Sequence, residues 1–99
     1  MGNGGGMHGE YKTPGGKLVV ADFAVEGGAL RGVVISGDFF LYPEETLPTI
    51  TGALEGALSD ADTGALAARI VAALPPGVEM LGFSPEAIGR AVRRGLGDA

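Results

Sequence analysis

The chain has 99 residues, which is enough for one small domain with a modest core and excludes a two-domain enzyme with a cleft between its domains. It contains no cysteine, which excludes disulfides, thiolate metal sites and cysteine nucleophiles and fits a reducing, cytoplasmic setting. Its net charge of −5 argues against nucleic acid or an anionic membrane as the main partner, and a protein partner suits this charge better.

The chain begins with a glycine-rich stretch, residues 1–9. Such a stretch loses much backbone entropy on ordering and offers almost nothing to bury, so we expect a disordered tail. His8, the one histidine of the chain, lies in this stretch. Because catalysis needs a preorganised site, the sequence predicts no nucleophile–base pair within this chain.

Two strands joined by a tight turn are expected next. The run Lys17–Glu26 alternates apolar side chains at period two, which is typical of a half-buried strand. Gly27-Gly28 suits a hairpin turn because glycine tolerates positive φ angles, so residues 29–35 should return antiparallel. A glycine among apolar residues that are out of phase predicts a bulge near Arg31-Gly32.

A short third strand is expected at Phe39–Tyr42, where large apolar residues follow the break Ser36-Gly37-Asp38. The first strand has apolar residues on both faces, since Leu18, Val20 and Ala24 lie opposite its main apolar stripe. A layer of helices on one side would leave this second face in water, which indicates a partner.

Three helices should follow the strands. Pro43 and the acids after it are typical of a helix start, but Pro48 would lose a helical hydrogen bond if the helix began there. We therefore expect a separate short turn and then a helix over residues 47–58 whose inward stripe is Leu47, Ile50, Leu54 and Leu58. The second helix should begin at Asp60, Asp62 or Thr63 and stop at Pro75-Pro76-Gly77, and the third should begin at Ser84-Pro85-Glu86 and end near Gly95 or Gly97.

The order of these elements predicts the fold class. A hairpin, a third strand and then helices indicate an α+β fold, in which a small antiparallel three-stranded sheet carries helices on one face. The single domain should span residues 10–97, after the tail of residues 1–9.

Two loops carry residue types suited to binding an anion. Gly15-Gly16-Lys17 offers glycine N–H groups and a positive charge, although the spacing of a Walker A loop is absent and a solvated turn explains the same residues. Asp38 is the one carboxylate suited to acid–base chemistry. Its alternative role is local, because an aspartate after glycine commonly bonds the N–H groups of a turn.

The other polar groups favour structural roles. Asp60 and Asp62, the carboxylates weighed as metal ligands, stand where helix caps belong. Arg90, Arg93 and Arg94 offset the negative end of the last helix. Arg90 and Arg94 also fall one turn apart on one face, where contact with an acidic partner surface is the alternative.

Three segments of the chain together carry a family pattern. They are Lys12–Leu18, the hairpin into Val33–Leu41, and Leu81–Glu86 followed by Ile88. They resemble the C-terminal accessory domain of lipoate–protein ligases, which in some organisms is a separate subunit, and the likeness covers residues 10–96. The resemblance implies a fold similar to that of iron–sulfur scaffold proteins, whose cysteines have no counterpart here. Pro48 and the glycine-rich tail depart from the family pattern.

The resemblance also implies partners and ligands. In that family a catalytic partner joins lipoate to ATP as lipoyl-AMP and passes the lipoyl group to a lysine of an acceptor domain, and the accessory part is needed for adenylation. It implies a heterodimer in which ATP, Mg and lipoate bind the catalytic partner, this chain holds no cofactor, and lipoyl acceptor domains are indirect partners. The residues that it suggests lie near the adenylate or the partner are Gly15, Gly16, Lys17, Ser36, Gly37, Asp38, Phe39 and Phe40, with Lys17 offsetting phosphate charge and glycine N–H groups donating hydrogen bonds.

Two functions from different classes follow from these observations. The first is a non-catalytic accessory subunit that a lipoate–protein ligase requires for ATP-dependent lipoate activation in protein lipoylation. The alternative is a stand-alone module that binds a protein or a small molecule through the exposed sheet face. The missing nucleophile–base pair excludes an independent hydrolase.

Overall fold

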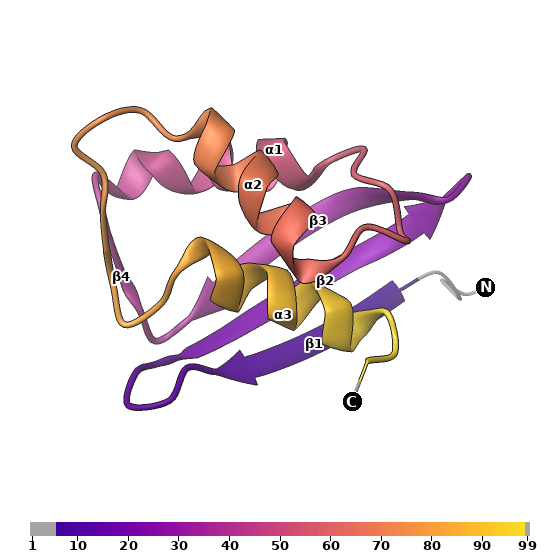
Figure 1. Cartoon of the computed structure of the whole chain (residues 1–99), viewed down its shortest axis with the longest axis horizontal. Coiled ribbons are helices and arrows are strands. Elements are labelled where there is room, and N and C mark those ends of the chain that lie inside the picture. The colour runs from indigo at the N-terminus through magenta and orange to yellow at the C-terminus, as the bar shows by residue number, and fades with distance from the viewer. Residues whose placement is uncertain (1–5, 99) are drawn as a thin grey trace.

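A computed structural model describes residues 6–98 of the chain (Figure 1). Its elements in chain order are β1 (Gly6–Lys12), β2 (Leu18–Glu26), β3 (Ala29–Gly37), β4 (Phe40–Tyr42), the 3₁₀ turn η1 (Glu44–Thr46), α1 (Leu47–Leu54), α2 (Thr63–Ala73), β5 (Glu79–Leu81) and α3 (Pro85–Gly95). Strands β1, β2 and β3 form an antiparallel sheet in that order. Helices α1 and α3 pack on one face of this sheet, and α2 packs against both helices (Figure 1). The predicted fold class, α+β with a three-stranded antiparallel sheet and helices on one face, is confirmed.

The strands that make up the main sheet differ from the prediction. Residues 6–9, predicted to be part of a disordered tail, form the first half of β1 and pair with β2. Phe40–Tyr42, predicted as the third strand of this sheet, instead pair with Glu79–Leu81 to form a separate two-stranded sheet. The predicted start of the domain at residue 10 is therefore wrong for residues 6–9. Residues 1–5 of the predicted tail lie outside the described residues.

Gly9 shows why a glycine-rich segment is ordered here. It is buried beneath α3, and a Cβ at this position would overlap the carbonyl oxygen of Ala91 and the backbone nitrogen of Gly95. A Cβ on Gly95 would in turn lie 2.9 Å from the ring of Phe23. The two glycines thus let strand and helix approach backbone to backbone, which is a packing role that glycine also serves.

The β2–β3 hairpin follows the prediction closely. Residues 27 and 28 both have positive φ angles, 59° and 77°, as a tight hairpin turn requires. The predicted bulge is confirmed, because Gly32 and Val33 of β3 together lie opposite Phe23 of β2. The N–H groups of Gly32 and Val33 donate to the Glu55 carboxylate at 3.1 and 2.6 Å. This side chain therefore satisfies two backbone donors that the bulge leaves without a ladder partner.

The first long helix ends earlier than predicted. Helix α1 stops at Leu54, and Leu58, predicted to face inward, is 62% exposed. Beyond the helix the backbone pairs with β3: the Leu30 N–H donates to the Ala57 carbonyl at 2.9 Å, and the Gly56 N–H donates to the Leu30 carbonyl at 2.8 Å. These bonds cover the free edge of β3 at this point, which explains why the chain leaves the helix. The separate short turn expected before the helix is present as η1.

The other two helices begin at predicted caps. The Asp62 carboxylate accepts from the Ala65 N–H at 2.8 Å, and the Ser84 hydroxyl accepts from the Ala87 N–H at 3.0 Å. Both helices also end within the predicted boundaries. Caps and proline stops act within one helical turn, so the sequence reveals them directly.

The core lies between the inner face of the main sheet and the helices. Val19, Ala21 and Phe23 of β2 are buried, as the period-two pattern predicts. The largest fully buried side chains are Leu30, Ile50, Leu54, Leu66, Ile70, Ile88, Val19 and Val92. No helix within residues 6–98 is both long and apolar enough to span a membrane.

Candidate functional site

Three loops meet at one end of the main sheet. They are the β1–β2 turn (residues 13–17), the β3–β4 connection (residues 36–40) and the β5–α3 connection (residues 82–84), and we call them together the three-loop end. The Lys17 N–H donates to the Gly82 carbonyl at 2.9 Å, which joins the first loop to the third. All eight predicted site residues therefore lie in two loops that the fold brings to the same end.

The second loop is joined to both of its neighbours. The Asp38 N–H donates to the Leu18 carbonyl at 3.2 Å, and Phe39 stacks on Phe83 with ring centroids 3.8 Å apart and planes 16° from parallel. A Cβ on Gly37 would overlap the Leu18 carbonyl oxygen, and the φ of Gly37 is 150°. Glycine is needed here for close approach between backbones, so this residue has a structural reason to be present.

Backbone donors in the first two loops are largely used within the protein. The Gly16 N–H donates to the Thr13 carbonyl at 2.8 Å, and the N–H groups of Lys17 and Asp38 also donate to carbonyls of the chain. The Thr13 hydroxyl is buried and has no hydrogen-bond partner among the described residues. The groups that remain open to a ligand or partner are therefore mainly side chains.

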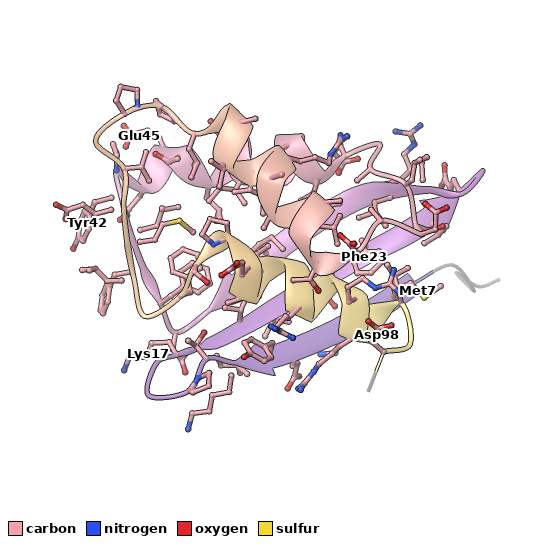
Figure 2. All side chains as sticks on the ribbon, in the orientation of Figure 1. Met7, Lys17, Phe23, Tyr42, Glu45 and Asp98 are labelled. Atoms are coloured by element: carbon pink, nitrogen blue, oxygen red, sulfur yellow. The ribbon has the colours of Figure 1, made fainter. Side chains whose placement is uncertain are left out.

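Most of the predicted site residues face solvent. Figure 2 shows Lys17 directed outward at this end of the molecule, and no carboxylate of residues 6–98 forms an ion pair with it. The exposed members of the predicted set are Gly15, Lys17, Ser36, Gly37, Asp38 and Phe40, and Gly16 and Phe39 are half-buried. Lys17 thus offers an unpaired ammonium group beside the loops.

An exposed apolar surface adjoins the three-loop end. Phe40 and Tyr42 of β4 and Leu81 of β5 are 57%, 52% and 52% exposed, and Phe40 lies directly opposite Leu81 in the ladder. We call these three residues the β4–β5 patch, and Figure 2 shows Tyr42 pointing away from the body of the protein. Leu41, between the two aromatic residues, faces the core. Clustered exposed apolar side chains of this kind mark protein contacts.

A pocket opens beside this patch. It has a volume of about 350 Å³ and is lined by Phe39, Phe40, Leu41, Tyr42, Glu44 and Leu47. Sequence reasoning had included Phe39 and Phe40 but missed Tyr42 and Leu81. The alternation of Phe40 and Tyr42 around Leu41 was a usable signal for Tyr42, whereas Leu81 joins them only through strand pairing.

The outer face of the main sheet is more polar than the sequence suggested. His8 bonds to the Asp22 carboxylate through Nδ1 at 2.6 Å and to the Glu10 carboxylate through Nε2 at 2.8 Å. Hydrogen bonds to Glu10 and then Asp22 hold the pKa of His8 above its ordinary value of 6.5. The assumption that His8 lies on a mobile tail is therefore wrong. This charged group crosses the apolar strip of Leu18 and Val20 and weakens the case for that face as a binding surface.

The carboxylates weighed as metal ligands have other positions. Asp62 caps α2, and Asp60 is exposed in the preceding loop. Within residues 6–98, no three side chains of histidine, aspartate or glutamate come together in a way that holds a metal ion.

These features define a small α+β protein whose open end combines three packed loops, a free lysine and an apolar patch. No protein-family model matches the sequence, and no curated protein sequence matches it. Among solved structures, the fold is similar to that of a chain from an archaeal lipoylation system, a bi-partite lipoate protein ligase and its E2 lipoyl domain from Thermoplasma acidophilum. The TM-score is 0.63 at 23% identity, over 89% of this chain and 92% of that chain. The likeness shows a shared fold across nearly the whole of both chains, which are thus of similar length.

Proposed function

We propose that this chain is the non-catalytic accessory subunit of a bipartite lipoate–protein ligase. The observation that carries the proposal is the meeting of the family segments Lys12–Leu18, Val33–Leu41 and Leu81–Glu86 at the three-loop end, although they are far apart in sequence. A shared fold with a chain from a bipartite ligase system supports the same assignment. In this proposal a separate catalytic chain binds ATP, Mg and lipoate, forms lipoyl-AMP and modifies the acceptor domain.

The β4–β5 patch is the surface that we propose docks on the catalytic chain. Its three large side chains are each more than half exposed, and they adjoin the loops that carry the family residues. Burying such side chains stabilises a complex by about 25 cal/mol for each Å² of apolar surface removed from water. Exposure of this patch in the isolated chain is therefore consistent with a heterodimer.

Lys17 is the residue that we propose acts at the adenylate. Its side chain is exposed and free of carboxylate partners within residues 6–98, so its charge is available to a phosphate group of the partner's ligand. A positive charge placed by docking would complete an adenylation site only when the two chains are together. This explains in physical terms why a ligase would need a subunit that holds no reactive centre.

Reconstitution tests the accessory role. The purified chain is added to a candidate catalytic subunit with lipoate, ATP and Mg, and pyrophosphate release is measured with and without it. We expect release to depend on the chain. Release at the same rate without the chain would show that the accessory role is wrong.

Lys17→Ala tests the proposed residue in the same assay. We expect a slower adenylation rate because the phosphate charge loses its partner, while Lys12→Ala, on the outer sheet face opposite Leu18, leaves the rate unchanged. If Lys17→Ala is as fast as the unmutated pair while release still needs the chain, the role of Lys17 is wrong and the accessory role stands.

A double variant tests docking at the patch. Tyr42→Ser with Leu81→Ser should abolish co-elution with the catalytic subunit on size-exclusion chromatography. Val71→Ser is the matched control, because Val71 is 58% exposed on α2, away from the patch. Co-elution of the double variant at full yield would exclude this surface as the interface.

A further inference from the structure

Two arginines on α3 share one aromatic ring. The guanidinium carbon of Arg90 lies 5.7 Å from the ring centroid of Tyr11 on β1, and that of Arg94 lies 5.1 Å from it. Arg94 also donates to the Glu10 carbonyl at 3.3 Å. Since β1 is an edge strand of the main sheet, both guanidiniums stand at an accessible border between helix and strand.

Their neighbour Arg93 shows what a structurally satisfied arginine looks like in this helix. Arg93 forms an ion pair with Asp98 at 2.9 Å and donates to the carbonyls of Ser59 and Ala61. Neither Arg90 nor Arg94 forms an ion pair with a carboxylate of residues 6–98. Two exposed cations are thus left without an anionic partner in a chain whose net charge is −5.

The helix dipole does not account for both residues. Arg94 lies in the last turn of α3, where a cation is favoured, but Arg90 lies one turn earlier. Two like charges at this spacing repel each other, and the face of the Tyr11 ring offsets that repulsion only in part. A carboxylate that reaches both guanidiniums would remove the repulsion and gain charge-assisted hydrogen bonds.

Space for such a group is present. A pocket of about 50 Å³ is lined by Tyr11, Thr63, Arg90, Arg93, Arg94 and Asp98. A water molecule takes up about 30 Å³ in the liquid, so the pocket suits one carboxylate rather than a nucleotide or a sugar.

We propose that Tyr11, Arg90 and Arg94 form a docking site for an acidic segment of a partner protein, in which one carboxylate of the segment bridges the two guanidiniums. Charge complementarity and the size of the pocket specify a glutamate or aspartate side chain on the partner. The site lies on the border of β1 and α3, and its assignment does not depend on the ligase role.

An NMR titration of the ¹⁵N-labelled chain with a hexaglutamate peptide at low ionic strength tests the site. We expect the largest shift changes at Tyr11, Arg90 and Arg94. Arg90→Ala with Arg94→Ala should weaken binding about tenfold, since each exposed ion pair contributes up to about 1 kcal/mol. Arg31→Ala, which removes an exposed arginine at the far end of β3, should leave binding unchanged.

Further arms decide between the outcomes. Arg90→Gln with Arg94→Gln keeps the length of both side chains and should give the same loss, and the spectra report whether each variant is folded. Equal weakening by Arg31→Ala would show that the peptide follows net charge alone and would overturn the proposal. Inorganic phosphate that shifts the same three residues as strongly as the peptide would also overturn it, in favour of a phosphate site. Because the isolated chain is used, neither result bears on the pyrophosphate test of the ligase role.

Discussion

Two regions of this protein use glycine for close packing, with opposite consequences. At the crossing of β1 and α3, Gly9 and Gly95 bring two backbones together above Phe23, which is only 4% exposed. At the three-loop end, Gly37 packs against Leu18 in the same manner, but the neighbouring Phe40 is 57% exposed. The first region spends its close packing on the core, and the second uses it to hold loops beside an open surface. Close backbone packing therefore identifies a constrained region without saying whether it serves stability or binding.

The largest expected effect comes from filling the β1–α3 crossing. Gly9→Val would place side-chain atoms where the Ala91 carbonyl and Gly95 lie, so we expect a loss of about 3 kcal/mol in the free energy of unfolding, measured with urea. The control is Gly52→Ala in α1, where a Cβ meets nothing within 4 Å and helix propensity predicts a gain of about 0.5 to 1 kcal/mol. A stable Gly9→Val protein would mean that the crossing is looser than the structure shows.

A smaller effect of opposite sign is expected at the three-loop end. Thr13→Val removes a buried hydroxyl that has no partner, so we expect the free energy of unfolding to rise by about 1 kcal/mol. Thr51→Val is the matched change at a satisfied hydroxyl, which donates to the Pro48 carbonyl at 3.1 Å, and it should not stabilise. Equal effects of the two variants in the same urea titration would contradict this account.

The β4–β5 patch should contribute little to stability. Phe40→Ser with Leu81→Ser changes exposed side chains, and we expect the free energy of unfolding to fall by less than about 1 kcal/mol. Leu41→Ser on the same strand should cost about 3 kcal/mol, because Leu41 is only 7% exposed and faces the core. A large loss in the double variant would show that the patch belongs to the fold rather than to a binding surface.

The smallest expected effect is the pH dependence from His8 on the outer sheet face. Bonds to Glu10 and Asp22 raise the pKa of His8, so its contribution to stability is fully present below pH 6.5 and is lost as the pH rises through the folded-state pKa. We therefore expect the thermal stability of the protein to fall relative to that of His8→Gln between about pH 6 and about pH 9. A difference that stays constant across this range would mean that the His8 contacts are absent in solution, and NMR titration of the imidazole checks the pKa directly.

Much of the fold was accessible from short-range patterns. The hairpin at residues 27 and 28, the bulge opposite Phe23, and the caps Asp62 and Ser84 were all predicted and are all present. Each depends on backbone preferences or hydrogen bonds within a few residues. The predicted site residues were grouped from a family resemblance, and the fold places them at one end, but their roles at an adenylate stay a prediction.

By itself, therefore, the sequence determined the fold class, the hairpin, the helix boundaries set by caps and prolines, and the lack of a reactive cysteine. Only the tertiary structure decided that residues 6–9 form a strand, that Phe40–Tyr42 pair with Glu79–Leu81, and that His8 lies between two carboxylates. The physical reason is that strand pairing and the burial of a glycine depend on atoms distant in sequence. Gly9 reads as flexible in its own segment and becomes a close-packed contact only when α3, more than seventy residues later, lies across it.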